Sequence, residues 1–440
     1  MTNPIREIET DVLVVGGGTA GFAAALSAAR SGLRVRLIEA GPKIGGVMAS
    51  CPGMPWGGGY PLGHSIGGIF AELTGRLLAM APPAAEVRPC ALENFGPEVQ
   101  YDHEAATLVM FDMLDQAGVI LHLNTFSGLP EMAGTRIGAV SAQDRLGPLR
   151  FLPRMVIDCS GDGDLSARAG VPYTLGDDRG NMMAVSLTFH MVGADTQAVF
   201  AEGDPYFRRF AARGIAEGRL HPDLHKLYLM RGFHPGTVFC NTVTIRGVDG
   251  TDPAAVARAT QEGRRRCQQV ARFLIKDVPG FQDAQMWGLG PTVGLRETRK
   301  LQALYRITGQ DIARGTRFGD GIVACDNPID DVMRDSAEMT HEAAVGRGAY
   351  YTIPFRALVP EAVENLLFAG RLICADPVAF ASVRGMPQCM AMGHATGVAA
   401  AVALEEQLRV QDVNGDALAE KLARQGVAGI AGRKLGAMQE

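Results

Sequence analysis

Three glycines and a carboxylate near the start of the chain have the residue types and spacing of a dinucleotide-binding turn: Gly16, Gly18 and Gly21, followed by Glu39. Gly16 permits a tight turn, Gly18 lets a pyrophosphate approach the backbone, and Gly21 lets the next helix pack closely against a sheet. The first turn of that helix would offer its free N–H groups and positive dipole end to the phosphates. Glu39 would accept hydrogen bonds from the two ribose hydroxyls. The alternative, a glycine turn of another α/β fold, leaves Glu39 unexplained.

The segments around this turn have the apolar patterns of the elements that must position it. Residues 11–15 are typical of a buried strand, an alanine-rich helix ends near Gly32, and residues 33–38 indicate a second apolar strand. Near the other end of the chain, residues 365–370 indicate a buried strand that runs into a glycine turn, and residues 386–407 indicate a buried helix. We therefore predict an α/β fold with a Rossmann-like nucleotide-binding domain, whose parallel sheet is completed by the end of the chain.

Other segments have a different character. A ribbon-like hairpin is predicted over about 127–141, as an addition to the parallel sheet. Residues 184–192 and 237–245 alternate like strands with one solvent-exposed face, and residues 253–276 form an amphipathic helix. These patterns predict a second, mixed α+β unit beside the nucleotide-binding domain.

We expect two domains. The first is a discontinuous cofactor domain of residues 1–172 and 353–440, with an excursion at about 51–100 that is loop-rich over 82–100. The second is an inserted substrate or cap domain of residues 173–352.

Composition and charge indicate which kinds of binding partner and which cellular location to expect. The net charge of −5 gives no electrostatic reason for nucleic-acid binding. Met1 to Thr10 lacks the hydrophobic core of a signal peptide, and the longest apolar tract, about 390–404, is too short for a membrane span. The eight cysteines show neither CxxC spacing nor a cluster with histidine, so we expect reduced thiols and no metal site. We therefore expect a cytoplasmic protein that acts on a small molecule, and a homo-oligomer is compatible with the sequence.

A second glycine-rich stretch, residues 288–294, does not repeat the dinucleotide signal. No apolar strand precedes it, and Pro291 interrupts the layout of a turn that runs into a helix. We interpret it as a loop of the substrate domain. A single fingerprint, in a domain that the end of the chain completes, favours a resident cofactor over a freely exchanging NAD.

Several separated segments resemble, in the right order, the FAD-dependent oxidoreductases of the fumarate-reductase-like (glutathione-reductase-type) superfamily. They are Gly16 to Gly46, Ile66 to Ile69, Val156 to Asp164, Gly294 to Arg299, and Ile353 through Arg371 and Ser382 to Gly397. The resemblance covers almost the whole chain. It implies FAD as the cofactor, bound noncovalently.

The resemblance also implies which residues contact FAD. These are Gly16, Gly18, Thr19, Ala20 and Gly21 at the pyrophosphate; Glu39 at the adenosine ribose; Lys43, Gly45 and Gly46 at the ribityl and phosphate region; Ser127 at adenine; Gly161 and Asp162 beneath the cofactor; and Gly370, Arg371, Val383 and Arg384 around the isoalloxazine ring. The sequence departs from the pattern at two positions. Arg371 replaces an acid that many relatives use to hold a ribityl hydroxyl, and His394 stands where a glutamine is expected.

Charged and titratable residues outside these motifs are the candidates for catalysis. Arg296 and Arg299, with Glu297 between them, could bind a carboxylate or another planar anion; the alternative is a buried interdomain network of ion pairs. His190 and His64 could each take a proton while a hydride leaves the substrate, and for each of them a structural role is the alternative. Weaker candidates are Tyr173 and Cys51. A covalent histidyl–flavin link through His64 is the alternative to noncovalent binding.

The sequence therefore predicts an FAD-dependent enzyme of the dehydrogenase or oxidase type, which transfers a hydride between flavin N5 and a small polar molecule. The reaction would be at a C–H bond next to oxygen, nitrogen or a carbonyl, or a C–C desaturation, with oxygen, quinone or another protein as electron partner. One alternative is an NAD(P)H-dependent flavin monooxygenase. Another is an electron-transfer subunit that binds FAD, and a third is a noncatalytic nucleotide-binding regulator.

Overall fold

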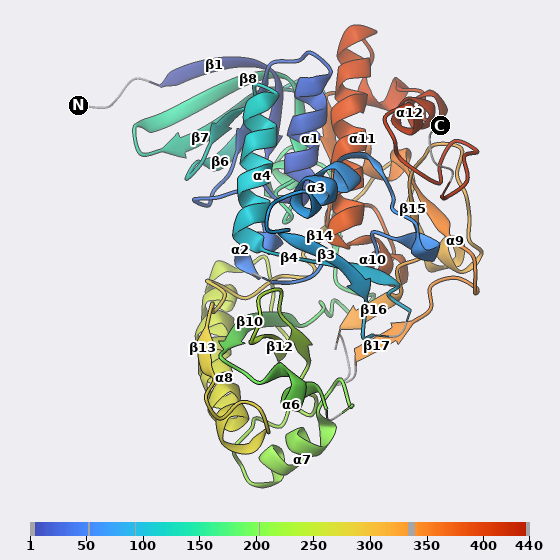
Figure 1. Cartoon of the computed structure of the whole chain (residues 1–440). Helices are drawn as coiled ribbons and strands as arrows, with labels where there is room; N and C mark the ends of the chain where they lie inside the picture. The colour runs from blue at the N-terminus through green and yellow to red at the C-terminus, as the bar shows by residue number, and fades with distance from the viewer. Residues whose placement is uncertain (1–4, 52, 93, 202, 333–338, 437–440) are drawn as a thin grey trace.

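The computed structural model describes residues 5–436 apart from residues 52, 93, 202 and 333–338. The first four residues of the Met1–Thr10 stretch thus lie outside the described residues. The chain folds as an α/β protein in which a mostly parallel sheet and its helices form one lobe and a smaller antiparallel sheet forms a second (Figure 1).

The larger sheet has the predicted Rossmann-like arrangement. Its parallel strands lie in the order β5 (Ile120–His122), β2 (Val35–Ile38), β1 (Arg6–Val15) and β8 (Gly147–Asp158). The last strand, β19 (Leu366–Phe368), pairs parallel with the end of β8. The prediction that a distant segment completes the sheet is therefore confirmed.

The predicted ribbon is the antiparallel extension of this sheet. Strand β6 (Phe126–Ala133) pairs with β7 (Arg136–Asp144), which pairs in turn with the first half of β8. Strand β8 is therefore parallel to β1 along most of its length but antiparallel to β7. It joins the two kinds of sheet.

Small residues let the two central helices approach closely. Helix α1 (Thr19–Arg30) and helix α11 (Met386–Glu405) run side by side in the larger lobe (Figure 1). A Cβ atom at Gly393 of α11 would lie only 2.0 Å from the carbonyl oxygen of Ala20, and one at Gly397 would lie 2.0 Å from the hydroxyl of Ser27. The fingerprint helix is therefore fixed against a helix from the last quarter of the chain.

The second lobe is a four-stranded antiparallel sheet covered by one long helix (Figure 1). Its strands lie in the order β11 (Leu229–Arg231), β12 (Thr237–Ile245), β10 (Val185–Val192) and β13 (Gln285–Trp287), and the helix is α8 (Pro253–Asp277). The prediction of one solvent-exposed face is wrong for β10, which is buried on both faces except at its last residue. One face packs on α8, and the other faces the larger lobe, so neither meets bulk water.

Part of the excursion is more regular than expected. Strands β3 (Ala85–Pro89) and β4 (Pro97–Tyr101) form a hairpin where the sequence indicated loops. Trp56 pairs with Val99 of this hairpin through the backbone and stacks on Tyr101, with ring centroids 4.2 Å apart. This ring stack anchors the irregular chain before α3 (Gly68–Leu78) to the hairpin and to α4 (His103–Gln116) behind it.

The remaining elements are short or terminal. They are α2 (Val47–Ser50), α5 (Asp164–Arg168), β9 (Tyr173–Leu175), α6 (Thr196–Phe200), α7 (Arg208–Ala216), β14 (Arg299–Leu301), α9 (Gly309–Ala313), β15 (Gly321–Cys325), β16 (Ile329–Val332), β17 (Met339–Glu342), β18 (Tyr351–Pro354), α10 (Pro377–Val383) and α12 (Gly415–Arg424). Within the described part of the chain, no helix combines the length and the apolar character that crossing a membrane requires.

The chain has separate hydrophobic cores, and their residues support a proposal for the division into domains. Buried apolar side chains between Val185 and Val293 form a core of their own. Those between Ile307 and Val359 pack into the main core of the larger lobe. We propose that the substrate lobe proper is centred on residues 185–293.

Candidate active site

The fingerprint turn has the close backbone contacts that its glycines predict. Gly16 has a φ of +96°, and a Cβ there would lie 2.6 Å from the carbonyl oxygen of Cys159. A Cβ at Gly21 would lie 1.8 Å from the carbonyl oxygen of Gly16. No side chain caps the first turn of α1, which begins after Gly18, so its N–H groups are available to an anion.

The second glycine loop lies against this turn. Gly45 donates its N–H to the carbonyl of Gly17 at 2.8 Å, and a Cβ at Gly46 would lie 2.9 Å from the Cα of Gly18. Any side chain at Gly46 would therefore fill the approach to the turn. Lys43 points elsewhere, because its ammonium pairs with Glu104 of α4 at 2.8 Å.

Glu39 closes the turn from the end of β2. Its carboxylate accepts hydrogen bonds from the N–H groups of Gly17 and Gly41, both at 2.7 Å. The backbone carbonyl of Glu39 accepts a bond from Thr125, two residues before Ser127 of β6. The carboxylate expected at the ribose and the strand expected at adenine thus lie at the same end of the sheet.

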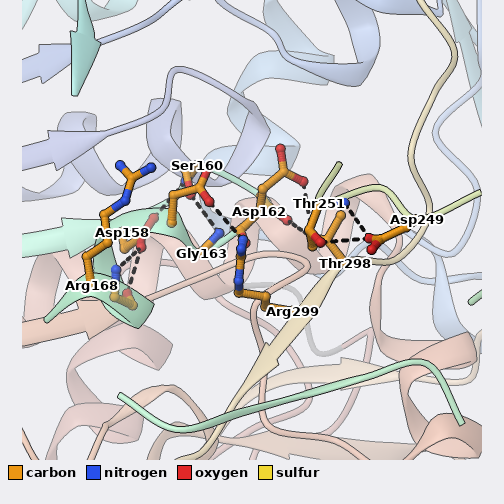
Figure 2. Close-up of polar contacts among 12 residues, drawn as sticks. Asp158, Ser160, Asp162, Gly163, Arg168, Asp249, Thr251, Thr298 and Arg299 are labelled. Carbon is orange, nitrogen blue, oxygen red and sulfur yellow. Dashed lines mark hydrogen bonds and ion pairs between the residues drawn. The ribbon is translucent and has the colours of Figure 1, made fainter. Parts of the chain in front are cut away.

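A loop of acidic and small residues follows β8 and carries Gly161 and Asp162 (Figure 2). Asp158 is fully buried and accepts hydrogen bonds from the backbone of Ser160 and the hydroxyl of Ser166. Asp162 accepts one bond from the Thr298 hydroxyl at 3.1 Å. These bonds fix the loop at the carboxyl end of the parallel strands, where α/β folds bind their ligands.

Arg371 reaches this loop from the turn after β19. Its Nη2 donates to Asp162 Oδ1 at 3.1 Å, and a Cβ at Gly161 would lie 2.7 Å from the same nitrogen. Its Nη1 is buried and has no hydrogen-bond partner among the described residues. Gly370 has a φ of +84°, and a Cβ there would lie 3.2 Å from the Cβ of Ala20. We call the close-packed glycines of the two loops (Gly16, Gly18, Gly21, Gly45 and Gly46) the glycine cradle. A buried hydrogen-bond donor without an acceptor, next to this cradle, fits a bound FAD.

Val383 is the last residue of α10, and Arg384 follows it in the turn before α11. Val383 is fully buried in the core, whereas Arg384 donates to Asp330 Oδ2 at 2.7 Å and to its carbonyl oxygen at 2.9 Å. The long helix α11 begins two residues later, at Met386. Its positive end and Arg384 therefore lie on the same side of the molecule.

A cavity of about 220 Å³ lies between the two lobes. It is lined by Val47, Cys51, Met54, Pro55, Gly57, Cys90, Leu92, Phe95, Glu98, Ser186, Thr188, Tyr228, Met230, Asn241, Gly294, Leu295, Arg296, Asn327, Asp330, Val332, Arg371, Ala381, Arg384, Gly385 and Met386. The cavity thus brings the proposed cofactor residues Arg371 and Arg384 together with the face of the second sheet that carries Ser186 and Thr188.

The structure separates the two arginines of the charged cluster. Arg296 lines the cavity and donates from Nη1 to the Ala184 carbonyl at 2.7 Å and to the Ser186 hydroxyl at 2.8 Å. Burial, together with the positive charge of Arg384, lowers the pKa of Arg296 to about 10. Arg299 instead binds the loop after β8, through the Asp162 carbonyl at 2.9 Å (Figure 2).

Glu297 turns away from the cavity. It is fully buried and pairs with the buried ammonium of Lys300, while its second oxygen accepts the N–H of Met183 at 3.0 Å. Arg299 also pairs with Asp164 at 2.8 Å. The alternative of a buried ion-pair network therefore describes Glu297 and Arg299, and the anion-site interpretation applies to Arg296 alone.

Neither candidate histidine lines the cavity. The ring of His190 packs against Phe239, and a Cβ at Gly53 would lie 2.6 Å from it. His64 is exposed and lies beside Gly436 in the C-terminal segment. Among the weaker candidates, Tyr173 is exposed, under the guanidinium of Arg299, whereas Cys51 does line the cavity.

His394 has a structural environment. It is buried in α11, and its Nε2 is 2.7 Å from the side-chain oxygen of Gln425 at the end of α12. Its other ring nitrogen would lie 3.0 Å from a Cβ at Gly68. The departure from glutamine at this position thus serves packing between α3, α11 and α12.

Several polar residues of the cavity were not among the predicted site residues. They are Ser186, Thr188, Asn241, Asn327, Asp330 and Glu98. A signal for two of them was present, because Ser186 and Thr188 are alternate positions of a predicted strand and must share one face. Among the described residues, no group of three or more His, Cys, Asp or Glu side chains could hold a metal ion.

Comparisons with known proteins extend these observations. A family model described as FAD dependent oxidoreductase matches residues 11–422. The 4-oxocyclohex-2-ene-1-carboxylate 5-dehydrogenase of Sinomonas cyclohexanicum is 42% identical over 77 residues, which are 18% of this chain and 13% of that protein. Sarcosine oxidase subunit alpha of Corynebacterium sp. (strain U-96) is 52% identical over 46 residues, which are 10% of this chain and 5% of that protein. The matches thus span only a small part of these relatives.

Solved structures resemble most of the chain in fold. The p-nitrophenol 4-monooxygenase PnpA from Pseudomonas putida DLL-E4 has a TM-score of 0.50 and 12% identity, with 92% of this chain and 82% of that chain covered. At this identity the likeness is one of fold alone.

Proposed function

Because the chain belongs to the FAD-dependent oxidoreductase family, we propose that it transfers a hydride between FAD and a small polar organic molecule bound between the two lobes. FAD is the cofactor of the family. The flavin ring supplies reversible hydride transfer when it is bound. We propose further that the chain belongs to the fumarate-reductase-like superfamily.

We propose that FAD is held noncovalently by the glycine cradle and by the turns that follow β8 and β19. The open N–H groups of α1 would bind the diphosphate, and Glu39 the ribose. The buried, unpartnered Nη1 of Arg371 would donate to the cofactor beside Gly161. The glycine cradle fits the family's cofactor because side chains at Gly16, Gly21 or Gly46 would collide with the neighbouring backbone. Arg371 fits it because its Nη1 lacks an acceptor among the described residues.

The observation that carries the proposal is the cavity. On one side it is lined by Arg371 and by Val47 and Gly385, which directly follow the proposed cofactor residues Gly46 and Arg384. On the other side it is lined by Ser186 and Thr188 of the second sheet. A molecule in this space would contact both lobes and be shielded from bulk water. The hydroxyls of Ser186 and Thr188 offer orienting hydrogen bonds, which hydride transfer needs for alignment.

The charges around the cavity suit electron acceptance. The beginning of α11 brings positive potential to the side that Gly385 and Met386 line, whereas the charge of Arg384 there is paired with Asp330. Positive potential near a flavin's N1 edge favours its reduced form. Oxygen, quinone or another protein would remove the electrons afterwards.

Anaerobic incubation of the FAD-loaded protein with a panel of small polar metabolites tests the proposal. We expect at least one metabolite to abolish the visible absorption of the oxidised flavin without a nicotinamide. If only NADPH does so, and oxygen is then consumed in proportion, the flavin monooxygenase interpretation replaces this one. If nothing but dithionite reduces the flavin, hydride transfer from a metabolite is wrong.

A further inference from the structure

Three guanidinium groups line the cavity, and their partners differ. Arg384 pairs with Asp330 at 2.7 Å, and Arg371 pairs with Asp162 at 3.1 Å. Among the described residues Arg296 has no carboxylate partner, since its bonds go to a backbone carbonyl and to the hydroxyl of Ser186. One positive charge in the cavity is therefore not balanced.

The other charged or ionisable side chains that line the cavity do not neutralise the positive charge of Arg296. Glu98 pairs with Arg88 at 3.1 Å, and Asp330 is already engaged by Arg384. The thiol of Cys51 lies near Arg296, but burial raises its pKa above the ordinary value, so it is neutral. A buried charge without a counter-ion costs free energy, and that cost is removed when a ligand brings the opposite charge.

Most of the exposed lining of the cavity is apolar. Its apolar side chains include Met54, Leu92, Phe95, Tyr228, Met230 and Val332. The volume of about 220 Å³ is smaller than the roughly 300–1,000 Å³ typical of sites for drug-sized ligands. A ligand must therefore be small, and apart from its charged end it meets these apolar side chains and a few uncharged polar groups, among them Ser186, Thr188 and Asn241.

We propose that the substrate is a monoanion, a carboxylate at Arg296 with a compact apolar or ring-shaped body against this wall. This inference rests on the proposed function, since it names the substrate class of the same cavity. One unbalanced cation matches one negative charge, so the second charge of a dicarboxylate would meet only arginines that are already paired, Arg371 and Arg384. The carboxylate would accept hydrogen bonds from the Arg296 nitrogens that do not bind Ala184 and Ser186.

The test uses benzoate and benzamide as probes, because they share a shape and differ in charge. Each is titrated into the oxidised FAD-loaded protein, and binding is followed by the change in the flavin absorption spectrum. We expect benzoate to bind at least about tenfold more tightly than benzamide. Equal affinities, or a spectrum that neither probe changes, would overturn the proposal. Succinate should bind more weakly than benzoate, and the reverse order would also overturn it.

Two variants assign the preference to one residue. Arg296→Gln should bring benzoate to the affinity of benzamide, whereas Arg272→Gln, at an exposed position of α8, should leave both affinities unchanged. Retention of the benzoate preference in FAD-loaded Arg296→Gln would contradict the assignment. The comparison of probes in the unmodified protein needs no variant, so it stands even if a variant fails to load FAD.

The outcome is separable from that of the proposed function. Probe binding requires no turnover, so a protein that prefers benzoate but is reduced by no metabolite retains the anion site and loses the hydride-transfer proposal. A protein reduced only by neutral metabolites retains hydride transfer and loses the anion site.

Discussion

Arg371 and Asp162 follow neighbouring parallel strands, and the hydrogen bond between Arg371 Nη2 and Asp162 Oδ1, at 3.1 Å, joins the two turns. More than two hundred residues of chain separate them. The second terminal nitrogen of Arg371 is buried and has no hydrogen-bond partner in the part of the chain that the structure describes, and Arg371 also lines the cavity. The arginine that stands where many relatives are expected to have an acid is thus itself paired with an acid on the adjacent turn.

Asp162→Ala should weaken FAD binding. The change removes the acceptor that orients Arg371, and hydrogen bonds to charged groups contribute about 1.5–3 kcal/mol. Since Arg371 and Asp162 are partly exposed, we expect the low end, or about a tenfold rise in the FAD dissociation constant measured by flavin fluorescence. Asp178→Ala, at an exposed position of a nearby loop, is the control and should bind FAD normally. Normal binding by Asp162→Ala as well would show that the pair does not serve the cofactor.

Glu39→Ala should weaken FAD binding in a different way. In the structure the carboxylate holds Gly17 and Gly41, both at 2.7 Å, so its loss frees the turn as well as the ribose contact. We expect an affinity loss of about 1.5–3 kcal/mol, and Glu39→Gln, which keeps an acceptor oxygen, should lose less. Fluorescence titration with FAD measures both, with the exposed Glu9→Ala as reference. An unaltered FAD affinity in Glu39→Ala would count against the assignment of this residue.

Gly393→Ala should destabilise the fold. The new Cβ would lie 2.0 Å from the carbonyl oxygen of Ala20, so α1 and α11 must separate, at a cost of about 1–3 kcal/mol or more. Gly75→Ala, inside α3, is the matched control, because a Cβ there meets no atom within 4 Å and alanine is the better helix former by about 0.5–1 kcal/mol. In urea denaturation followed by circular dichroism, the midpoint should be lower for Gly393→Ala, and higher for Gly75→Ala, than for the unmodified protein. A midpoint for Gly393→Ala at or above that of the unmodified protein would be inconsistent with the close helix contact.

His394 should contribute to the loss of stability in mild acid. Burial lowers its pKa below the ordinary 6.5, although the hydrogen bond to Gln425 opposes this. The unfolded chain therefore binds the proton more readily, and stability that is fully present above about pH 6.5 is lost as the pH falls toward the folded-state pKa. His394→Gln should flatten the dependence of the unfolding free energy on pH between about pH 7 and about pH 5.5. An unchanged slope in His394→Gln would refute the prediction.

The sequence predicted the cofactor lobe well because its signals are local. The glycine turn, the apolar runs at 11–15 and 365–370, and the alanine-rich helix that ends near Gly32 each specify an element without knowledge of distant contacts. The hairpin at 85–101 was missed because proline and polar residues flank and interrupt its strands. Its stability comes from Trp56 and Tyr101, which meet only in the folded chain.

The substrate side was less predictable for a geometric reason. Arg296 and Arg299 are three residues apart, but they do not lie on a helix, so spacing could not show that one lines the cavity and the other binds the loop after β8. His190 lies on the strand that contributes Ser186 and Thr188, yet it is beyond the cavity. Which residues carry out catalysis stays a prediction, because the distance of a side chain from the substrate is a tertiary property.

The most direct measurement is the anaerobic reduction of FAD by the metabolite identified in the panel, in the unmodified protein and in Thr188→Phe. Thr188 is fully buried at the cavity wall, so phenylalanine would occupy the space proposed for the substrate without touching the glycine cradle. We predict that Thr188→Phe retains FAD and is reduced by dithionite but not by the metabolite, whereas the exposed Thr174→Phe behaves like the unmodified protein. Reduction of FAD-loaded Thr188→Phe by the metabolite at the unmodified rate would contradict the account, because the reaction would then not take place in this cavity.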